Sequence, residues 1–260
     1  MVGSGFEITK GEIPVILHVP HSSREIPQDI RKDILLNNEQ LKSELDEMTD
    51  SHTDKIAALA VADLSKQPWI FRNKLSRLVI DPERFPDERE IMNQVGMGAV
   101  YQKSSNGEWL RREDFDPKQL IENYFKPYAS AFTQLVEQIL IKHKTVFIID
   151  VHSYRVNQHP NAVNHGQARP PICLGTDDFH TPIWLRQLAK DCFSTVGEVI
   201  ENQPYAGTYV PLDFYEKDDR VLSIMLECRA DQFLNPDLTL HSGAQKVAGA
   251  LSSLISKAKI

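Results

Sequence analysis

The stretch PVILHVPHSSREIP, from Pro14 to Pro27, begins as a run of β-branched and aliphatic residues and stops abruptly at His21. A second apolar run, TVFIIDVHSYR from Thr145 to Arg155, stops in the same way at His152. Continuous apolar runs of this length predict strands that are covered on both faces of a sheet. Each of the two predicted strands therefore carries a histidine at its carboxyl end.

The rest of the chain alternates short apolar runs with longer periodic segments. Strands are predicted over residues 14–19, 69–71, 76–81, 145–151, 171–175 and 221–228. Helices are predicted over residues 38–64, 117–143, 181–196 and 238–257, and Pro127 should kink the second of these or end its first part. Strands interleaved with helices are typical of an α/β fold, so we expect a mixed sheet with helices on both faces.

Length and composition favour one domain over residues 1–260, because 41% hydrophobic residues in 260 suffice for a sizeable core. The net charge of -7 argues against a nucleic-acid surface. A small anionic substrate is compatible with this charge, since a few arginines reverse the field inside a cleft. Three cysteines without metal-type spacing, no membrane-length apolar run and no secretion leader favour a cytoplasmic protein without a membrane partner.

The two strand-end histidines are the first candidates for chemistry. Residues just past the carboxyl ends of neighbouring strands in an α/β sheet converge on one crevice, so we expect His21 and His152 to be neighbours. Two imidazoles and a carboxylate form a catalytic zinc site, which has three protein ligands and one open position for water. The segment EMTDSHTD offers three carboxylates around His52: Glu47, Asp50 and Asp54. Asp150 lies two residues before His152, and it is better suited to orient the imidazole than to bind the metal itself.

Two further segments combine carboxylates with arginines. SRLVIDPERFP, residues 76–86, carries Arg77, Asp81 and Arg84. SIMLECRADQF, residues 223–233, places Glu227 and Arg229 two positions apart, on one face of a predicted strand. Such pairs are also typical of structural ion pairs. Beside a metal-bound water, however, a glutamate is the usual general base for amide hydrolysis, and arginines bind a substrate carboxylate through two hydrogen bonds.

Taken in order, VPHSSREIP, DSHTD, SRLVID, YFKPY and DVHS resemble the N-formylglutamate amidohydrolase family over about residues 14–230. DVHS, ERFP and the Glu-x-Arg of LECR are more distantly similar to the zinc aminoacylases and carboxypeptidases. The resemblance implies a phosphorylase/hydrolase-like, zinc exopeptidase-like fold around one zinc ion. It also implies hydrolysis of a small anionic N-acyl amino acid, with N-formyl-L-glutamate giving formate and glutamate as the reference reaction.

Carried over position by position, the resemblance implies roles for particular residues. The metal ligands would be His21, Asp50 and His152, with His52 as the alternative third ligand. Glu227 would be the general base, and Asp150 would orient a ligand from behind. Three arginines would bind the substrate: Arg77, Arg84 and Arg229.

The chain also departs from the family pattern. DPERFP replaces the Asp-Leu-Asn-Arg-Pro common in the deformylases, and Ala129 stands where they often carry histidine, so the substrate is less defined than the chemistry. Two alternatives stay open: a non-catalytic member that binds an acidic ligand, and a carboxypeptidase-like hydrolase. A thiol nucleophile is disfavoured, because strand alternation points Cys228 away from the face of Glu227. The polar loop at residues 155–171 follows the second histidine strand, where functional loops tend to lie.

Overall fold

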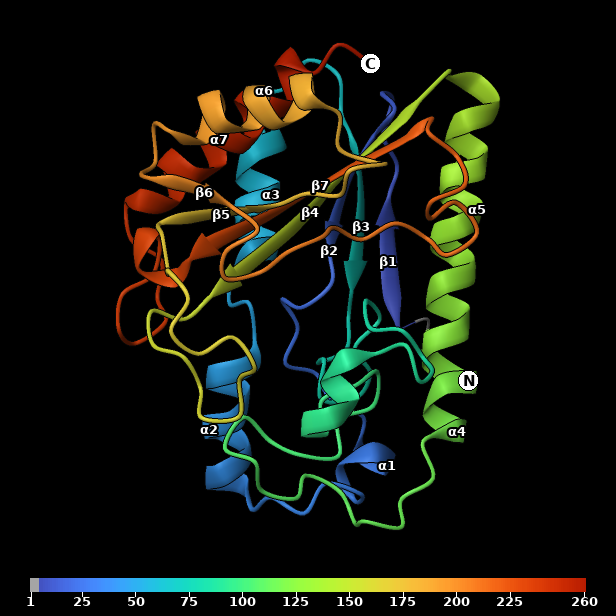
Figure 1. The fold of residues 1–260 in the computed structure, drawn as a ribbon, viewed down its shortest axis with the longest axis vertical. Helices are drawn as coiled ribbons and strands as arrows, with labels where there is room; N and C mark the ends of the chain where they lie inside the picture. Colours follow the sequence, from blue (N-terminus) through green and yellow to red (C-terminus); the bar gives the residue numbers. More distant parts are fainter. Residues whose placement is uncertain (1–4) are drawn as a thin grey trace.

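The computed structural model describes residues 5–260 and contains one mixed sheet of seven strands in the order β1-β3-β2-β4-β7-β5-β6 (Figure 1). The pairs β1–β3 and β7–β5 are antiparallel, and the other four pairs are parallel. The strands are β1 (Phe6–Thr9), β2 (Val15–Val19), β3 (Trp69–Asn73), β4 (Val146–Tyr154), β5 (Ile172–Gly175), β6 (Val199–Glu201) and β7 (Val221–Arg229). The predicted mixed α/β sheet is confirmed.

Helices cover both faces of this sheet, as predicted. One face packs against α3 (Thr53–Val61), α6 (Ile183–Phe193) and α7 (Gly243–Lys257), and the other packs against α5 (Lys126–Lys142) (Figure 1). The other helical segments are α1 (Gln28–Arg31), α2 (Asn38–Met48), η1 (Ile91–Val95), α4 (Lys118–Leu120), the π-helical η2 (Ile121–Phe125) and η3 (Ala230–Gln232). Pro127 lies in the first turn of α5, where its missing N–H is tolerated. No helix among the described residues is both long and apolar enough to cross a membrane.

The centre of the sheet sets the position of the strand ends. All residues of β2 and β4 are buried, in agreement with their continuous apolar sequences. The two strands pair in parallel, with His18 opposite Asp150, and β4 pairs in parallel with β7, with His152 opposite Glu227. The carboxyl ends of β2, β4 and β7 therefore open on the same edge of the sheet.

The strand predicted over residues 76–81 is wrong, because this segment is a turn. The Ser76 carbonyl accepts a hydrogen bond from the Val79 N–H at 2.8 Å, and the Ser76 hydroxyl accepts one from the Leu78 N–H at 3.2 Å. Leu78 packs into one small apolar cluster, whereas Val79 and Ile80 pack into another. The apolar run reflects burial between two clusters rather than a place in the sheet.

The single helix predicted over residues 38–64 is also wrong, because it is two helices separated at residues 49–52. His52 has a left-handed backbone with φ of 68°, which ends the helical path between α2 and α3. The Asp50 N–H donates to the His21 carbonyl at 3.1 Å, so the break ties Asp50 to the end of β2. The short edge strands β1 and β6 were not predicted.

We predict that Leu135→Ala lowers the free energy of unfolding by ~2–5 kcal/mol, because it leaves a cavity between α5 and the sheet. Leu135 is 3% exposed. Urea unfolding followed by circular dichroism measures the change. Ile141→Ala, at an 83% exposed position of the same helix, is the matched control and should stay within ~0.5 kcal/mol of the parent. Equal losses in both variants would contradict the assigned buried face.

Candidate active site

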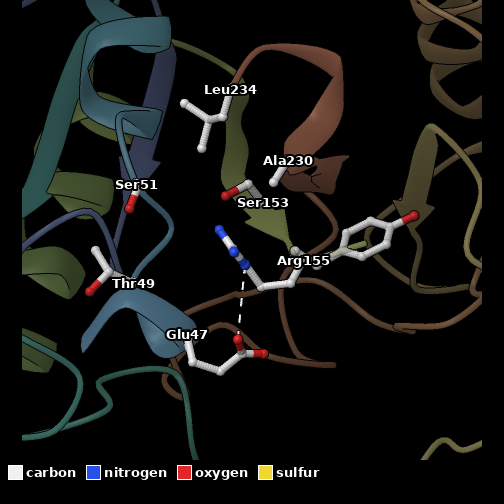
Figure 2. Close-up of a pocket in the computed structure, with 8 residues that line it drawn as sticks. Glu47, Thr49, Ser51, Ser153, Arg155, Ala230 and Leu234 are labelled. Carbon is white, nitrogen blue, oxygen red and sulfur yellow. Dashed lines mark ion pairs between the residues drawn. The ribbon is translucent and has the colours of Figure 1, made fainter. Parts of the chain in front are cut away.

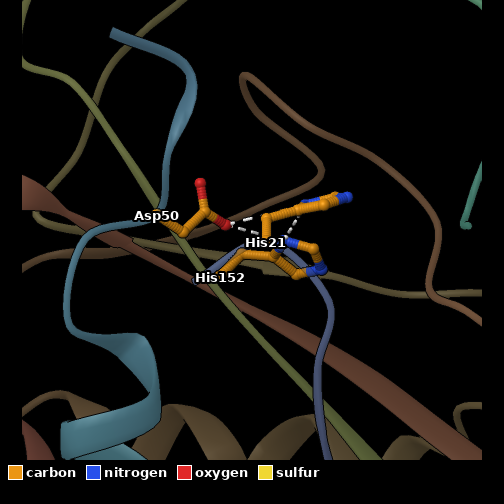
Figure 3. A group of neighbouring side chains, drawn as sticks. All are labelled: His21, Asp50 and His152. Atoms are coloured by element: carbon orange, nitrogen blue, oxygen red, sulfur yellow. Dashed lines mark hydrogen bonds and ion pairs between the residues drawn. The ribbon is translucent and has the colours of Figure 1, made fainter. Parts of the chain in front are cut away.

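Three buried side chains from separate segments meet at the carboxyl ends of β2 and β4: His21, Asp50 and His152 (Figure 3). His21 Nδ1 lies 3.2 Å from His152 Nδ1, and Asp50 Oδ2 lies 3.0 Å from His152 Nδ1. Asp50 Oδ2 is 3.8 Å from His21 Nδ1. The structure thus brings together the two strand-end histidines and one of the carboxylates between α2 and α3, and this group can hold a metal ion.

The donor atoms fit zinc in kind and in spacing. Two imidazole nitrogens and a carboxylate oxygen are ligands that zinc accepts in catalytic sites. Ligand atoms of a tetrahedral zinc lie about 3.3–3.4 Å apart when each bond is about 2.0–2.1 Å. The three separations, 3.0, 3.2 and 3.8 Å, bracket that value. The group is therefore compatible with one zinc ion.

The second nitrogen of each imidazole faces a carboxylate. His21 Nε2 lies 2.9 Å from Asp81 Oδ1, and His152 Nε2 lies 3.1 Å from Asp150 Oδ1. A carboxylate that accepts the Nε2–H holds the proton there and leaves the Nδ1 lone pair available for a metal. Asp150 lies where it was predicted to lie, behind His152, and Asp81 takes the equivalent place behind His21.

Asp81 is itself held by several groups. Its Oδ2 accepts hydrogen bonds from Arg77 Nη2 at 2.7 Å and from the Tyr101 hydroxyl at 2.8 Å. Burial alone would raise the pKa of Asp81, but the Arg77 and His21 charges outweigh it and hold the pKa well below its usual range. Arg77, predicted to grip the substrate, is thus engaged with Asp81 as an ion pair.

Glu83 is a further neighbour of these histidines that the sequence did not predict. Its carboxylate oxygens lie 3.1 Å from His152 Nε2 and 3.3 Å from His18 Nδ1. His18 Nδ1 also lies 2.9 Å from Asp150 Oδ1, and its Nε2 lies 2.5 Å from the Tyr128 hydroxyl. The one sequence feature that pointed to Glu83 is that DPERFP departs from the motif common in the deformylases. Glu83 contributes to two further donor groups that overlap the first: His18, Glu83 and Asp150, and His21, Asp81 and Glu83.

Glu227 is a buried carboxylate beside this group. It lies on β7 opposite His152, is 7% exposed, and its Oε2 has no hydrogen-bond partner within residues 5–260. Burial raises the pKa of Glu227 to about 8; the nearby Asp50 charge adds to this rise and His152 opposes it. A metal cation bound nearby would lower this pKa again. Glu227 can therefore exchange a proton near neutral pH.

A cavity of about 1130 Å³ opens onto these side chains. Its walls come from α5, from η1 and from the loops at residues 155–169 and 204–215. Arg84 lines it with a side chain that is 30% exposed and lies 3.6 Å from Asp81 and 3.8 Å from Glu90. A much smaller pocket of about 20 Å³ lies next to it, where Arg155 and Glu47 approach within 3.9 Å (Figure 2).

Two predicted site residues lie outside the cavity. Arg229 is absent from the described residues that line it, because its side chain pairs with Asp231 at 2.7 Å and donates to the carbonyl of Arg169. His52 belongs to none of the metal-binding groups of residues 5–260, and its Nε2 lies 3.0 Å from the Leu238 carbonyl. Of the two proposed third ligands, the structure therefore places Asp50, and not His52, with the histidines.

Comparison with known proteins identifies the family to which this α/β protein belongs. The chain belongs to the N-formylglutamate amidohydrolase family, whose model matches residues 13–234, so the resemblance seen in the sequence is confirmed. This membership makes the protein an amidohydrolase. A search of the curated proteins found no match.

Solved structures show the same fold. The crystal structure of N-formylglutamate amidohydrolase from Ralstonia eutropha JMP134 is 18% identical, with a TM-score of 0.77 over 96% of this chain and 95% of that one. A gene product from Agrobacterium tumefaciens is 20% identical, with a TM-score of 0.69 over 98% and 94% of the two chains. At these sequence identities, the likeness to the two solved structures shows a shared fold and nothing further.

We predict that the purified protein holds about one zinc per chain and that His21→Ala, His152→Ala and Asp50→Ala each lose most of it, because each removes a donor atom. His52→Ala should keep its zinc, since this ring faces Leu238. Elemental analysis of the purified variants measures the content, and circular dichroism checks their fold. Retention in Asp50→Ala with loss in His52→Ala would reverse the choice of third ligand.

We also predict that Asp81→Asn lowers zinc affinity by about 10- to 100-fold, the usual effect of removing a carboxylate behind a histidine ligand. Chelator competition measures the affinity. Asp218→Asn, which alters another arginine-paired carboxylate outside the cavity, is the control and should bind zinc as the parent does. An unchanged affinity in Asp81→Asn would show that this carboxylate does not tune the ligand.

Proposed function

We propose that this protein is a zinc-dependent amidohydrolase that cleaves the amide bond of an N-formyl or N-acyl amino acid, with N-formyl-L-glutamate as the reference substrate. His21, Asp50 and His152 would hold the zinc ion. The observation that carries the proposal is the unpartnered Oε2 of Glu227, buried beside this donor group in a cavity large enough for a substrate. Family membership supports the amide chemistry.

The bound ion would polarise the substrate carbonyl and make water more acidic at neutral pH. Glu227 takes a proton from the attacking water while the water oxygen bonds to the carbonyl carbon. The C–N bond then breaks, and Glu227 returns the proton to the departing amine. The products are a carboxylate, formate in the reference reaction, and the free amino acid. A carboxyl group with a pKa near the working pH suits both proton transfers.

Asp81 and Arg77 support this chemistry by orienting His21, one of the proposed metal ligands. The Arg77–Asp81 pair holds His21 with Nε2 protonated, and the Tyr101 hydroxyl completes the shell of Asp81. Within residues 5–260, the carboxylate oxygen nearest to Arg84 lies 3.6 Å away, so its guanidinium is less engaged than that of Arg77. We assign Arg77 to positioning and Arg84 to the substrate.

The size of the cavity bears on which acyl groups the substrate can carry. Its volume of about 1130 Å³ exceeds the ~300–1,000 Å³ of ordinary ligand pockets. Met92, Met97 and Phe125 add apolar surface to its wall, and Ala129 contributes only a methyl group. Acyl groups larger than formyl therefore fit, and the proposed substrate class includes them.

We predict that Glu227→Gln keeps its zinc and its fold but lowers kcat for formate release from N-formyl-L-glutamate by about 10²- to 10⁴-fold, the usual weight of a general base. The amide cannot accept the proton of water. Steady-state kinetics at matched zinc content measures the effect.

Cys228→Ser is the matched control from the adjacent position of β7, since Cys228 is buried and belongs to the packed core. It should remain active. An inactive Cys228→Ser with an active Glu227→Gln would replace the proposed mechanism with thiol chemistry. A zinc-loaded parent that cleaves none of a panel of N-formyl and N-acetyl amino acids would refute the function itself.

A further inference from the structure

The cationic side chains that line the cavity differ in whether they pair with a carboxylate. Five of them have a carboxylate oxygen within 4.0 Å: Arg77 with Asp81, Arg84 with Asp81, Arg89 with Asp87, Lys126 with Glu122 and Arg155 with Glu47. Arg169 also lines the cavity, but no carboxylate oxygen of residues 5–260 lies within 4.0 Å of its guanidinium; its charge acts only more weakly on Glu47, where it opposes the rise in pKa that burial causes. A partly buried guanidinium without a counter-charge is unusual, because an unpaired charge is costly to desolvate.

The guanidinium of Arg169 is held by neutral groups on one side. Its Nε donates to the Val156 carbonyl at 3.1 Å, and its Nη2 donates to the Arg155 carbonyl at 2.6 Å. Its carbon Cζ lies 4.9 Å from the centre of the Tyr154 ring. Nη1 is buried and has no hydrogen-bond partner among the described residues. Nη1 thus keeps an unused N–H beside Tyr205, in the wall of the cavity.

The backbone that carries Arg169 is anchored to the ends of β4 and β7. Arg229 donates through its side chain to the Arg169 carbonyl and through its backbone N–H to the Pro171 carbonyl, the latter at 2.9 Å. The Tyr154 hydroxyl donates to the Pro170 carbonyl. These bonds give Arg229, which does not line the cavity, a positioning role. A guanidinium held in this way loses little conformational freedom when it binds a ligand.

Arg169 and Glu227 are electrostatic neighbours of the same tyrosine. Burial raises the pKa of Tyr205; the Glu227 charge adds to the rise and the Arg169 charge opposes it. The Tyr205 ring also contacts the Tyr154 ring edge-on, with centres 5.5 Å apart, and Tyr205 lines the cavity. Arg169, Tyr205 and Glu227 thus line one cavity.

We infer that Arg169 binds a carboxylate of the substrate. A planar, permanently charged guanidinium with an unused N–H matches a carboxylate better than a neutral amide, and the substrate would supply the missing counter-charge. This inference rests on the proposed function for the identity of the substrate. It names Arg169, rather than Arg77 or Arg229, as a specificity-determining arginine.

The test compares three substrates at matched zinc content: N-formyl-L-glutamate, its side-chain amide and its α-amide. The parent should prefer the diacid over one of the two amides by about 10- to 100-fold in kcat/KM, the range for a charged hydrogen bond. In Arg169→Gln this preference should disappear, because kcat/KM for the diacid falls, mainly through KM, while that for the same amide stays. Arg169→Lys, which keeps the charge without the fork, should lie between the two.

Arg220→Gln alters an exposed arginine paired with Asp218 and should keep the preference of the parent. A preference that persists in Arg169→Gln, or a parent that distinguishes neither amide, would overturn the inference. Calorimetric titration of the zinc-loaded proteins with glutarate separates this result from failure of the proposed function. Should the parent hydrolyse none of the substrates, weaker glutarate binding by at least about tenfold in Arg169→Gln still supports Arg169, and equal binding refutes it.

Discussion

Parallel pairing of β2 with β4 is the constraint on which the site depends. With His18 opposite Asp150, the two strands end at nearly the same level, and His21 and His152 approach within 3.2 Å although 131 positions separate them. A shift of one residue in this register would turn the side chains of one strand to the opposite face of the sheet. The fully buried apolar residues of both strands oppose such a shift, so the packing of the core fixes the spacing of the donor atoms.

Charge balance explains why so many acids surround two histidines. Asp50, Asp81 and Asp150 are buried, and the partly exposed Glu83 belongs to the same network. Within this network, Arg77 and Arg84 pair with Asp81. These carboxylates outnumber the two guanidiniums, and a bound divalent cation would offset part of the excess negative charge. Glu83 pairs only with imidazoles among the described residues. Burial would raise the pKa of Glu83, but the His152 and His21 charges hold it well below its usual range.

The sequence predicted the features that follow from apolar runs, and it missed those that depend on contacts between distant segments or on local side-chain partners. Continuous apolar runs predicted β2, β4 and β7, and their terminal residues predicted the neighbourhood of His21, His152 and Glu227. The same pattern mistook residues 76–81 for a strand, because burial between two clusters also produces an apolar run. Strand alternation placed Arg229 with Glu227, but β7 ends at Arg229 and Asp231 captures the guanidinium. Neither composition nor spacing indicates such a local partner.

Arg77 and Arg169 show why residue type alone does not assign a role. Both line the cavity, and both lie near Glu227 or its neighbours. Arg77 pairs with Asp81, a buried carboxylate of the same turn. Its charge is therefore neutralised within the protein, where the pair orients His21. Arg169 rests on carbonyl oxygens and an aromatic ring, which orient the guanidinium without neutralising it. Only the second arrangement keeps a net attraction for an anion, because a carboxylate approaching Arg77 would also meet the negative charge of Asp81.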